Sequence, residues 1–157
     1  MVNDDVIIKY LSLASLYAKE FSQCRKVAVG SVIVKDNRIV SFGTNITAPA
    51  FSCKNIGCLR TALYGDNNKT HRAPGDCRAI HSEVDAIIKA KTDLTGAAIY
   101  ITRYPCEACA RAITDAGITE VYYGREQDIS DTTSAIFHYA GVSAYHIGSW
   151  KEEDVTT

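Results

Sequence analysis

Residues 97–123, with the sequence AAIYITRYPCEACARAITDAGITEVYY, contain two apolar runs separated by a segment of helical spacing. The runs over 97–102 and 119–123 indicate buried strands, and the segment between them predicts a helix over 106–116. Gly117 follows this helix, at a position where a left-handed residue commonly ends one. A strand, a helix and a strand in this order predict parallel strands joined by a right-handed crossover.

The flanking segments extend this unit in both directions. The further expected elements are helices over 4–21, 82–91 and 131–140 and strands over 27–34, 39–44 and 142–147. The first two of these strands flank a polar turn at 35–38, which predicts an antiparallel hairpin. We therefore expect a single domain of residues 1–157 with an α/β fold. It should be a three-layer sandwich, in which a mixed five-stranded sheet carries helices on both faces.

The segment 46–79 interrupts this regular pattern. It shows no sustained periodicity, which predicts a long irregular segment, and such segments in compact domains tend to be functional. Its cationic residues outnumber its acidic ones; they are Lys54, Arg60, Lys69, Arg72 and Arg78, against Asp66 and Asp76. A lid or effector loop that faces phosphate and a chance scatter of surface charge both fit this composition.

Composition narrows the classes of partner. The net charge of −1 lacks the basic surplus that binding to a polyanion usually needs, so we expect no nucleic-acid partner. No apolar run approaches the roughly 20 residues of a membrane-spanning helix, so we expect no membrane partner. The chain begins Met1-Val2-Asn3-Asp4-Asp5, which does not resemble a secretion signal, and we expect a cytoplasmic location.

Two of the six cysteines are spaced for metal binding. Cys106 and Cys109 stand three residues apart at the start of an expected helix, whose positive end favours thiolates. His81 begins the preceding expected helix. Because the two helices should start at the same end of the sheet, these three side chains predict a Zn²⁺ site.

Three protein ligands leave the fourth tetrahedral position of zinc to water, which is typical of a catalytic site. Glu83 follows His81 by two residues, so it lies close to the metal while remaining free to move protons. A Cys-x-x-Cys pair alone also occurs in redox proteins and structural zinc ribbons. A redox protein would not need Glu83, and a structural zinc module would need a fourth protein ligand.

The sequence His81-Ser82-Glu83 followed by Pro105-Cys106-Glu107-Ala108-Cys109 resembles the signature of zinc deaminases. The chain resembles, in particular, the deoxycytidylate deaminases of the cytidine deaminase superfamily. The similarity covers about 5–147 and includes the segments 29–34, 43–45, 77–83, 109–118 and 141–142. The chain departs from the family at Ser82, Asp85 and Ile46, where alanine, asparagine and glycine are usual.

The resemblance implies hydrolytic deamination of dCMP to dUMP, which supplies thymidylate synthesis. Glu83 would move protons from water to N3 and the departing amine. For substrate binding we expect the main chain of Ser82 at the base, Asn45 at the sugar or phosphate, and Arg103 at the phosphate. The residues leave dCTP open as a second substrate. A nucleoside or base deaminase also stays open, as does a tRNA-editing deaminase, although the latter should be distinctly basic.

The resemblance also implies features away from this centre. A second, non-catalytic zinc would bind about four of Cys24, Cys53, Cys58, His71 and Cys77, although free cysteine is also a common buried apolar residue. The implied assembly is a homohexamer that dCTP activates and dTTP inhibits, with Mg²⁺ accompanying the nucleotide effector.

Overall fold

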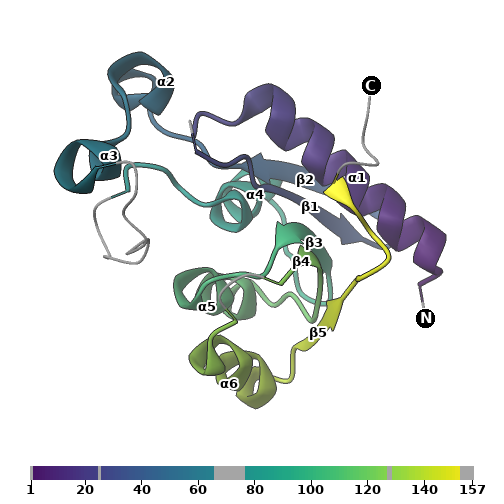
Figure 1. Cartoon of the computed structure of the whole chain (residues 1–157). Helices are drawn as coiled ribbons and strands as arrows, with labels where there is room; N and C mark the ends of the chain where they lie inside the picture. Colours follow the sequence, from purple (N-terminus) through teal and green to yellow (C-terminus); the bar gives the residue numbers. More distant parts are fainter. Residues whose placement is uncertain (1, 25, 66–76, 127–128, 153–157) are drawn as a thin grey trace.

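The computed structural model describes residues 2–24, 26–65, 77–126 and 129–152 (Figure 1). Its strands are β1 (Gly30–Lys35), β2 (Arg38–Thr44), β3 (Ala98–Arg103), β4 (Glu120–Arg125) and β5 (Ser143–His146). They form one sheet in the order β2-β1-β3-β4-β5. β1 is antiparallel to β2 and β3, whereas β3, β4 and β5 are parallel. The mixed five-stranded sheet is confirmed.

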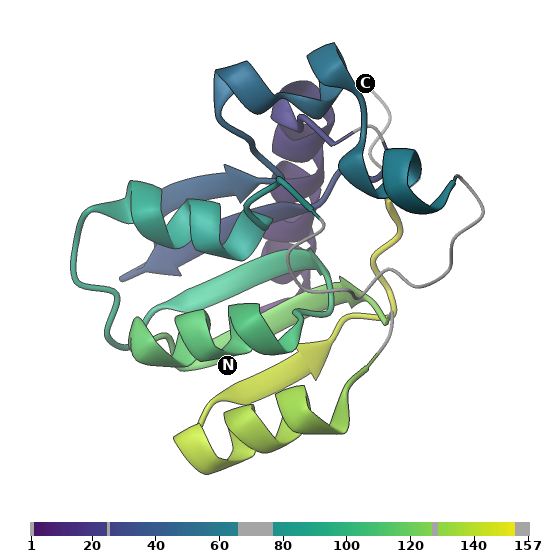
Figure 2. The ribbon, with the colours of Figure 1, turned by 90° about the vertical axis from the view of Figure 1, so that its left-hand side faces the viewer.

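Helices cover both faces of the sheet, as predicted. The main helices are α1 (Asp4–Phe21), α4 (Ser82–Ala90), α5 (Glu107–Asp115) and α6 (Asp131–Ala140). Figure 2 looks onto the face that carries α4, α5 and α6, with α1 behind the sheet. Within the described ranges, no helix is both long and apolar enough to cross a membrane.

Two glycines let helices approach the hairpin closely. A Cβ atom on Gly30 would clash with the carbonyl group of Ala14 in α1, and one on Gly43 would clash with the carbonyl oxygen of Ser82 in α4. Because side chains at these positions would push the helices away, Gly30 fixes how near α1 lies to the sheet and Gly43 fixes how near α4 lies.

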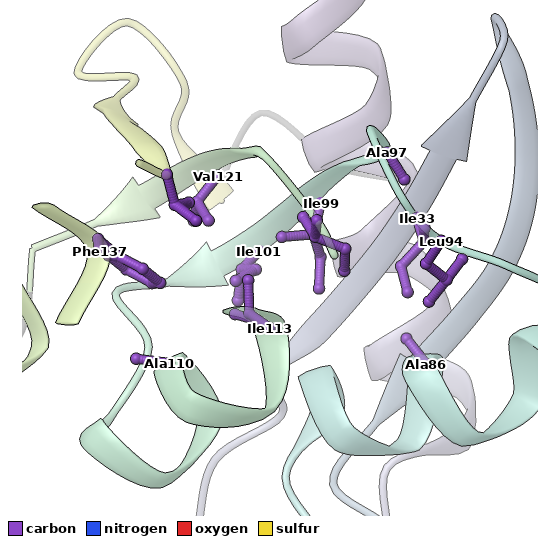
Figure 3. Close-up of a cluster of buried hydrophobic side chains, with 12 residues drawn as sticks. Ile33, Ala86, Leu94, Ala97, Ile99, Ile101, Ala110, Ile113, Val121 and Phe137 are labelled. Carbon is purple, nitrogen blue, oxygen red and sulfur yellow. The ribbon is translucent and has the colours of Figure 1, made fainter. Parts of the chain in front are cut away.

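The two faces of the sheet hold two apolar clusters. Ile99 and Ile101 point to the side of α4, α5 and α6, where they pack with Ile113 and Phe137 (Figure 3). Tyr100, between them in β3, points to the opposite side and packs beneath α1. This alternation follows from the two-residue period of a strand. It explains why the run 97–102 is continuously apolar.

The expectation of an irregular segment over 46–79 is wrong for much of its described part. That part contains η1 (Pro49–Phe51), α2 (Cys53–Ile56) and α3 (Leu59–Tyr64). The hydroxyl of Ser52 caps α2, and glycines at positive φ end both α-helices. Elements of four and six residues are too short to show helical periodicity in a sequence. The hairpin also differs at its start, because β1 begins at Gly30 and not at 27.

Candidate functional site

Three potential metal ligands meet at the starts of α4 and α5. His81 and Cys106 are the residues that precede the two helices, and neither side chain bonds to the helix backbone as a cap. Cys109 lies in the first turn of α5 and is buried. The Nδ1 atom of His81 lies 3.5 Å from Sγ of Cys106 and 3.4 Å from Sγ of Cys109. The predicted convergence of these residues is therefore present.

The chemistry of this cluster suits zinc. A hydrogen bond from Cys109 lowers the pKa of Cys106 to about 3, so the Cys106 sulfur is a thiolate at neutral pH. The same contact raises the pKa of Cys109, and the hydrogen bond with Cys106 raises the pKa of His81. In the part of the chain that the structure describes, no other group of three His, Cys, Asp or Glu side chains brings its ligand atoms within 4.8 Å of one another. An imidazole nitrogen and two sulfurs form an open tetrahedral donor set.

Glu83 lies beside the three ligands on the second residue of α4. Its side chain is buried, and this burial raises the pKa of its carboxyl group, although the charge of His81 opposes the shift. The hydroxyl of Ser82 donates a hydrogen bond of 3.0 Å to Oε2 of Glu83. A buried carboxyl group with a raised pKa is suited to accept and return a proton near neutral pH.

Asn45 is buried at the end of the hairpin, where its side-chain oxygen is already used within the protein. This oxygen accepts hydrogen bonds from the backbone N–H of Val29 at 2.6 Å and from the hydroxyl of Ser22 at 3.4 Å. The next residue, Ile46, pairs with Ile80 in an antiparallel bridge. Asn45 therefore shapes the backbone that adjoins His81, and the predicted contact with sugar or phosphate stays a prediction.

Arg103 ends β3, three residues before Cys106. In the parallel register of β3 and β4 it is opposite Arg125, which forms an ion pair of 2.7 Å with Glu152. Burial, and then the charge of Arg125, lower the pKa of Arg103. Two guanidinium groups and the carboxylate of Glu152 therefore lie close together at this end of the sheet.

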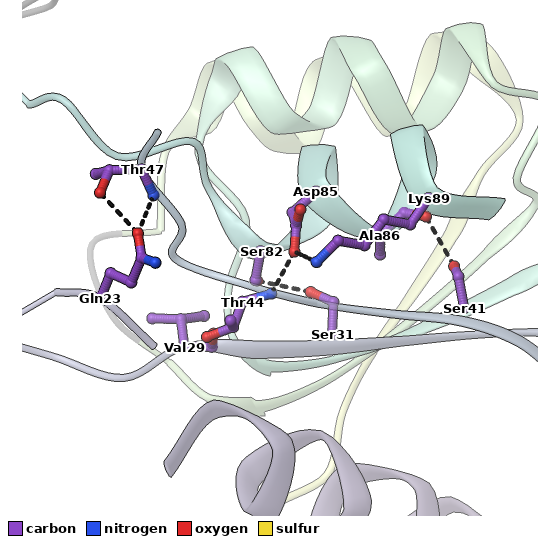
Figure 4. A network of polar contacts seen from close by, with 10 residues as sticks. All are labelled: Gln23, Val29, Ser31, Ser41, Thr44, Thr47, Ser82, Asp85, Ala86 and Lys89. Atoms are coloured by element: carbon purple, nitrogen blue, oxygen red, sulfur yellow. Dashed lines mark hydrogen bonds and ion pairs between the residues drawn. The ribbon is translucent and has the colours of Figure 1, made fainter. Parts of the chain in front are cut away.

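Two further residues near the cluster were not assigned a role from the sequence. Asp85 is buried in α4, where its carboxylate accepts hydrogen bonds from the backbone N–H of Thr44 at 3.1 Å and from Nζ of Lys89 at 2.8 Å (Figure 4). Arg60 in α3 is close enough to His81 for its charge to oppose protonation of the imidazole. Its Nε atom is buried without a hydrogen-bond partner in the described ranges. Only the local positive surplus of 46–79 indicated Arg60 in the sequence.

Four other cysteines, Cys24, Cys53, Cys58 and Cys77, form a second group that we call the thiol quartet. Burial raises the pKa of Cys53, and the charges of the other three raise it further, so all four lie within electrostatic reach. Burial opposes ionisation of Cys58 too, but hydrogen bonds from Thr61 and from the backbone of Arg60, together with the charge of Lys26, outweigh it and lower the pKa of Cys58. His71, the fifth predicted ligand, lies outside the described residues.

Known proteins share this combination of sequence and fold. Residues 5–125 match the family described as the cytidine and deoxycytidylate deaminase zinc-binding region. The deoxycytidylate deaminase of Mycobacterium phage D29 is 36% identical over 121 residues, which are 74% of this chain and 92% of the phage protein. ComE operon protein 2 of Bacillus subtilis is 34% identical over 130 residues, or 80% of this chain. The chain spans 63% of the length of that relative.

A solved structure shows the same fold. The dCMP deaminase of cyanophage S-TIM5, crystallised in complex with dCMP and dUMP, superposes with a TM-score of 0.71. The match covers 93% of this chain and 99% of the cyanophage protein, at 24% sequence identity. At that identity the likeness supports the fold alone.

Proposed function

Because the chain belongs to the cytidine and deoxycytidylate deaminase zinc-binding family, we propose that it catalyses the hydrolytic deamination of dCMP to dUMP, with release of ammonia. The observation that carries this proposal is the convergence of His81, Cys106 and Cys109 beside a buried glutamate. The similarity to the phage D29 deoxycytidylate deaminase, which covers 74% of this chain and 92% of the phage protein, supports dCMP as the substrate. One domain, built on the five-stranded sheet, would carry the whole reaction.

The three converging side chains would hold the zinc ion of this site. Zinc, when bound, supplies a Lewis acid that brings the pKa of a water molecule close to neutrality. The protein's own contribution is the rigid placement of the donors at two helix starts. The positive ends of these helices also favour the thiolates.

Glu83 is the proton carrier in this proposal. Its carboxylate would accept a proton from the water that attacks C4 of cytosine, and would deliver protons to N3 and to the departing amine. The raised pKa of the buried carboxyl group supports this role, because it brings the acid closer to the pH at which the protein works.

Substrate recognition would come from the surrounding loops. The main chain of Ser82 would contact the base, while Asn45 would contact the sugar or phosphate. Arg103, together with Arg60, would attract the phosphate. The charge of Arg60 acts on His81, which supports its nearness to the reacting base. The residues do not distinguish dCMP from dCTP, so both are candidate substrates.

The direct test compares Glu83→Gln with the unmodified protein on dCMP, dCTP, deoxycytidine and cytosine. We expect wild-type turnover to be fastest with a nucleotide. We expect Glu83→Gln to lose about 10³-fold in kcat, because general acid–base catalysis contributes 10²–10⁴-fold. Zinc content, measured by atomic emission, should be unchanged in the variant. Turnover that survives the substitution would remove Glu83 from the mechanism, and a preference for cytosine would remove the nucleotide assignment.

We further propose that the thiol quartet binds a second, structural zinc. The effect of the other three cysteines on the pKa of Cys53 and the lowered pKa of Cys58 support the proposal, since zinc binds thiolates. The quartet and the site at His81 predict two equivalents of zinc per chain. One equivalent in freshly purified protein, prepared without chelator, would contradict the second site.

The remaining proposals concern the oligomeric state, the nucleotide effectors and the cellular location. By resemblance, the protein would be a homohexamer that dCTP activates and that dTTP inhibits, each with Mg²⁺. Light scattering with and without the nucleotides tests the assembly, and initial rates of dCMP turnover test the effectors. The structure describes all six cysteines and pairs none of them in a disulfide, which is compatible with the proposed cytoplasmic location. The net charge of −1 supports a free nucleotide as substrate in preference to nucleic acid.

A further inference from the structure

Two buried serine hydroxyls connect the sheet to the carboxyl group of Glu83. The Oγ atoms of Ser31, in β1, and Ser82, in α4, lie 2.7 Å apart, and Ser82 donates to Oε2 of Glu83 at 3.0 Å. Figure 4 shows the side chains of Ser31 and Ser82 directed toward each other across the contact between strand and helix. Both serines are fully buried, and Glu83 is 4% exposed.

The direction of these hydrogen bonds follows from counting protons. A serine hydroxyl has one proton with which to donate a hydrogen bond, and Ser82 uses it in the hydrogen bond to the carboxylate of Glu83. The 2.7 Å contact between the two hydroxyls therefore needs the proton of Ser31, which donates to Ser82. The result is a chain of two donors that ends on one oxygen of Glu83 and leaves the other oxygen outside the chain.

The hydroxyl of Ser31 is not needed to form the sheet. The backbone of Ser31 pairs with Gly43 in β2 and with Ile101 in β3, so the strand is held on both sides without it. Gly43 also brings α4 against the hairpin at Ser82, because any side chain at position 43 would clash with the Ser82 carbonyl. The close packing therefore allows Ser31 to reach Ser82 from the strand.

We propose that Ser31 is a positioning residue, which acts through Ser82 to hold Oε2 of Glu83 and to leave Oε1 to exchange protons with water and substrate. This inference rests on the proposed deamination, and it adds to it a chain of contacts from the sheet to the proton carrier. A carboxylate fixed by one oxygen needs less reorganisation when the other oxygen reacts. Ser31 would therefore affect kcat without touching the substrate.

The test measures dCMP turnover in Ser82→Ala, Ser31→Ala and the double variant. Ser82→Ala should fold, because alanine is usual at this position in the resembled family. We expect a loss of about tenfold in kcat for Ser82→Ala, the size of one hydrogen bond to a charged group, with KM changed by less than about twofold. Ser31→Ala should lose about threefold in kcat on the same reasoning. The double variant should match Ser82→Ala, because Ser31 acts only through Ser82.

Ser41→Ala provides the matched control. Ser41 is also a buried serine of the hairpin that bonds to α4, but its hydroxyl donates to the carbonyl oxygen of Ala86 at 2.7 Å and does not contact Glu83. This variant should lose thermal stability to a similar extent as Ser31→Ala while keeping the wild-type kcat. A kcat loss in Ser41→Ala as large as in Ser31→Ala would overturn the proposal, because both would then report general loosening of α4.

Two further outcomes decide the proposal. If the fold-loss of kcat in the double variant equalled the product of the two single losses, Ser31 would not act through Ser82. Crystal structures of the zinc-loaded variants should show the Glu83 carboxylate in a single orientation in Ser41→Ala and in more than one in Ser82→Ala. A single unchanged orientation in Ser82→Ala would overturn the proposal. If the unmodified protein does not turn over dCMP, the proposed substrate fails, whereas the crystallographic comparison still tests the positioning of Glu83.

Discussion

This chain has two groups of potential zinc ligands, which stand on different supports: the first is His81 with Cys106 and Cys109, and the second is the thiol quartet. At the site with Glu83, the ligands stand at the starts of α4 and α5, two nine-residue helices that pack against each other on one face of the sheet. In the thiol quartet, Cys53 begins a four-residue helix and Cys58 precedes a six-residue one. The quartet's other two members, Cys24 and Cys77, lie outside helices and strands.

This difference in support corresponds to a difference in geometry. The first group brings its ligand atoms within 4.8 Å of one another, whereas no three members of the quartet do so. A rigid scaffold pre-organises a site for catalysis, and a site built on short elements is completed when the metal binds. We therefore expect loss of metal to stop the reaction at the first group and to loosen the fold at the second.

The largest predicted effect is on dCMP turnover, which should depend on the first group and not on the thiol quartet. Cys106→Ser should lose at least about 10³-fold in dCMP turnover together with one equivalent of zinc, because two ligands do not hold the ion in place. Cys53→Ser should lose the other equivalent and keep kcat within about threefold, while its melting temperature falls. The measurements are zinc by atomic emission, steady-state rates and thermal unfolding of the same preparations.

Equal effects of the two substitutions would contradict the comparison. If Cys53→Ser abolished turnover with zinc still bound at the first site, the quartet would be part of the catalytic machinery. If neither substitution changed the zinc content, both groups would have been misassigned as metal sites.

The second prediction uses the pH dependence of thiol alkylation in metal-free protein. The pKa of Cys106 is about 3, so its sulfur is already ionised at pH 6 and its rate should stay flat between pH 6 and 9. The pKa of Cys53 is raised above its ordinary value of 9.0, so its rate should rise about tenfold per pH unit over this range. Peptide mapping after iodoacetamide treatment measures both rates in one sample. Parallel slopes for the two cysteines would show that Cys106 lacks its stabilised thiolate.

The convergence of His81, Cys106 and Cys109 could be predicted because its signals are local. Cys106 and Cys109 are about one helical turn apart, and continuous apolar runs predict the strands on either side of α5. The order of the motifs then restricted the position of His81. Local spacing and a common crossover topology were enough to bring the three ligands together.

The features that were missed depend on distant contacts or on very short elements. Ser31 and Ser82 are 51 positions apart in the sequence, and no local pattern around either residue predicts their contact. The helices α2 and α3 contain four and six residues, fewer than two full turns, so no period could reveal them. The nearness of Arg60 to His81 followed only once these helices were placed. Sequence patterns therefore predicted the potential metal ligands, but they did not predict the contacts and short helices that surround them.

The smallest effect we predict concerns one such support, the anchor of α4 at Asp85. Asp85→Ala would leave the buried N–H of Thr44 without its acceptor and should reduce the free energy of unfolding by about 1–3 kcal/mol. Asp85→Asn keeps an acceptor for Thr44 and loses only the partly exposed ion pair with Lys89, so it should cost less than about 1 kcal/mol. Urea unfolding of the zinc-loaded proteins measures both values.

The corresponding change near the thiol quartet is Ser52→Ala, which removes the cap of α2 beside Cys53. It should reduce the free energy of unfolding by about 1 kcal/mol. The two changes differ in where the damage appears. Asp85→Ala should lower kcat, because the helix it loosens carries Glu83, whereas Ser52→Ala should weaken only the binding of the second zinc. If Ser52→Ala lowered kcat more than Asp85→Ala, the catalytic geometry would depend on the short helices, and the sheet would not be the scaffold that holds it.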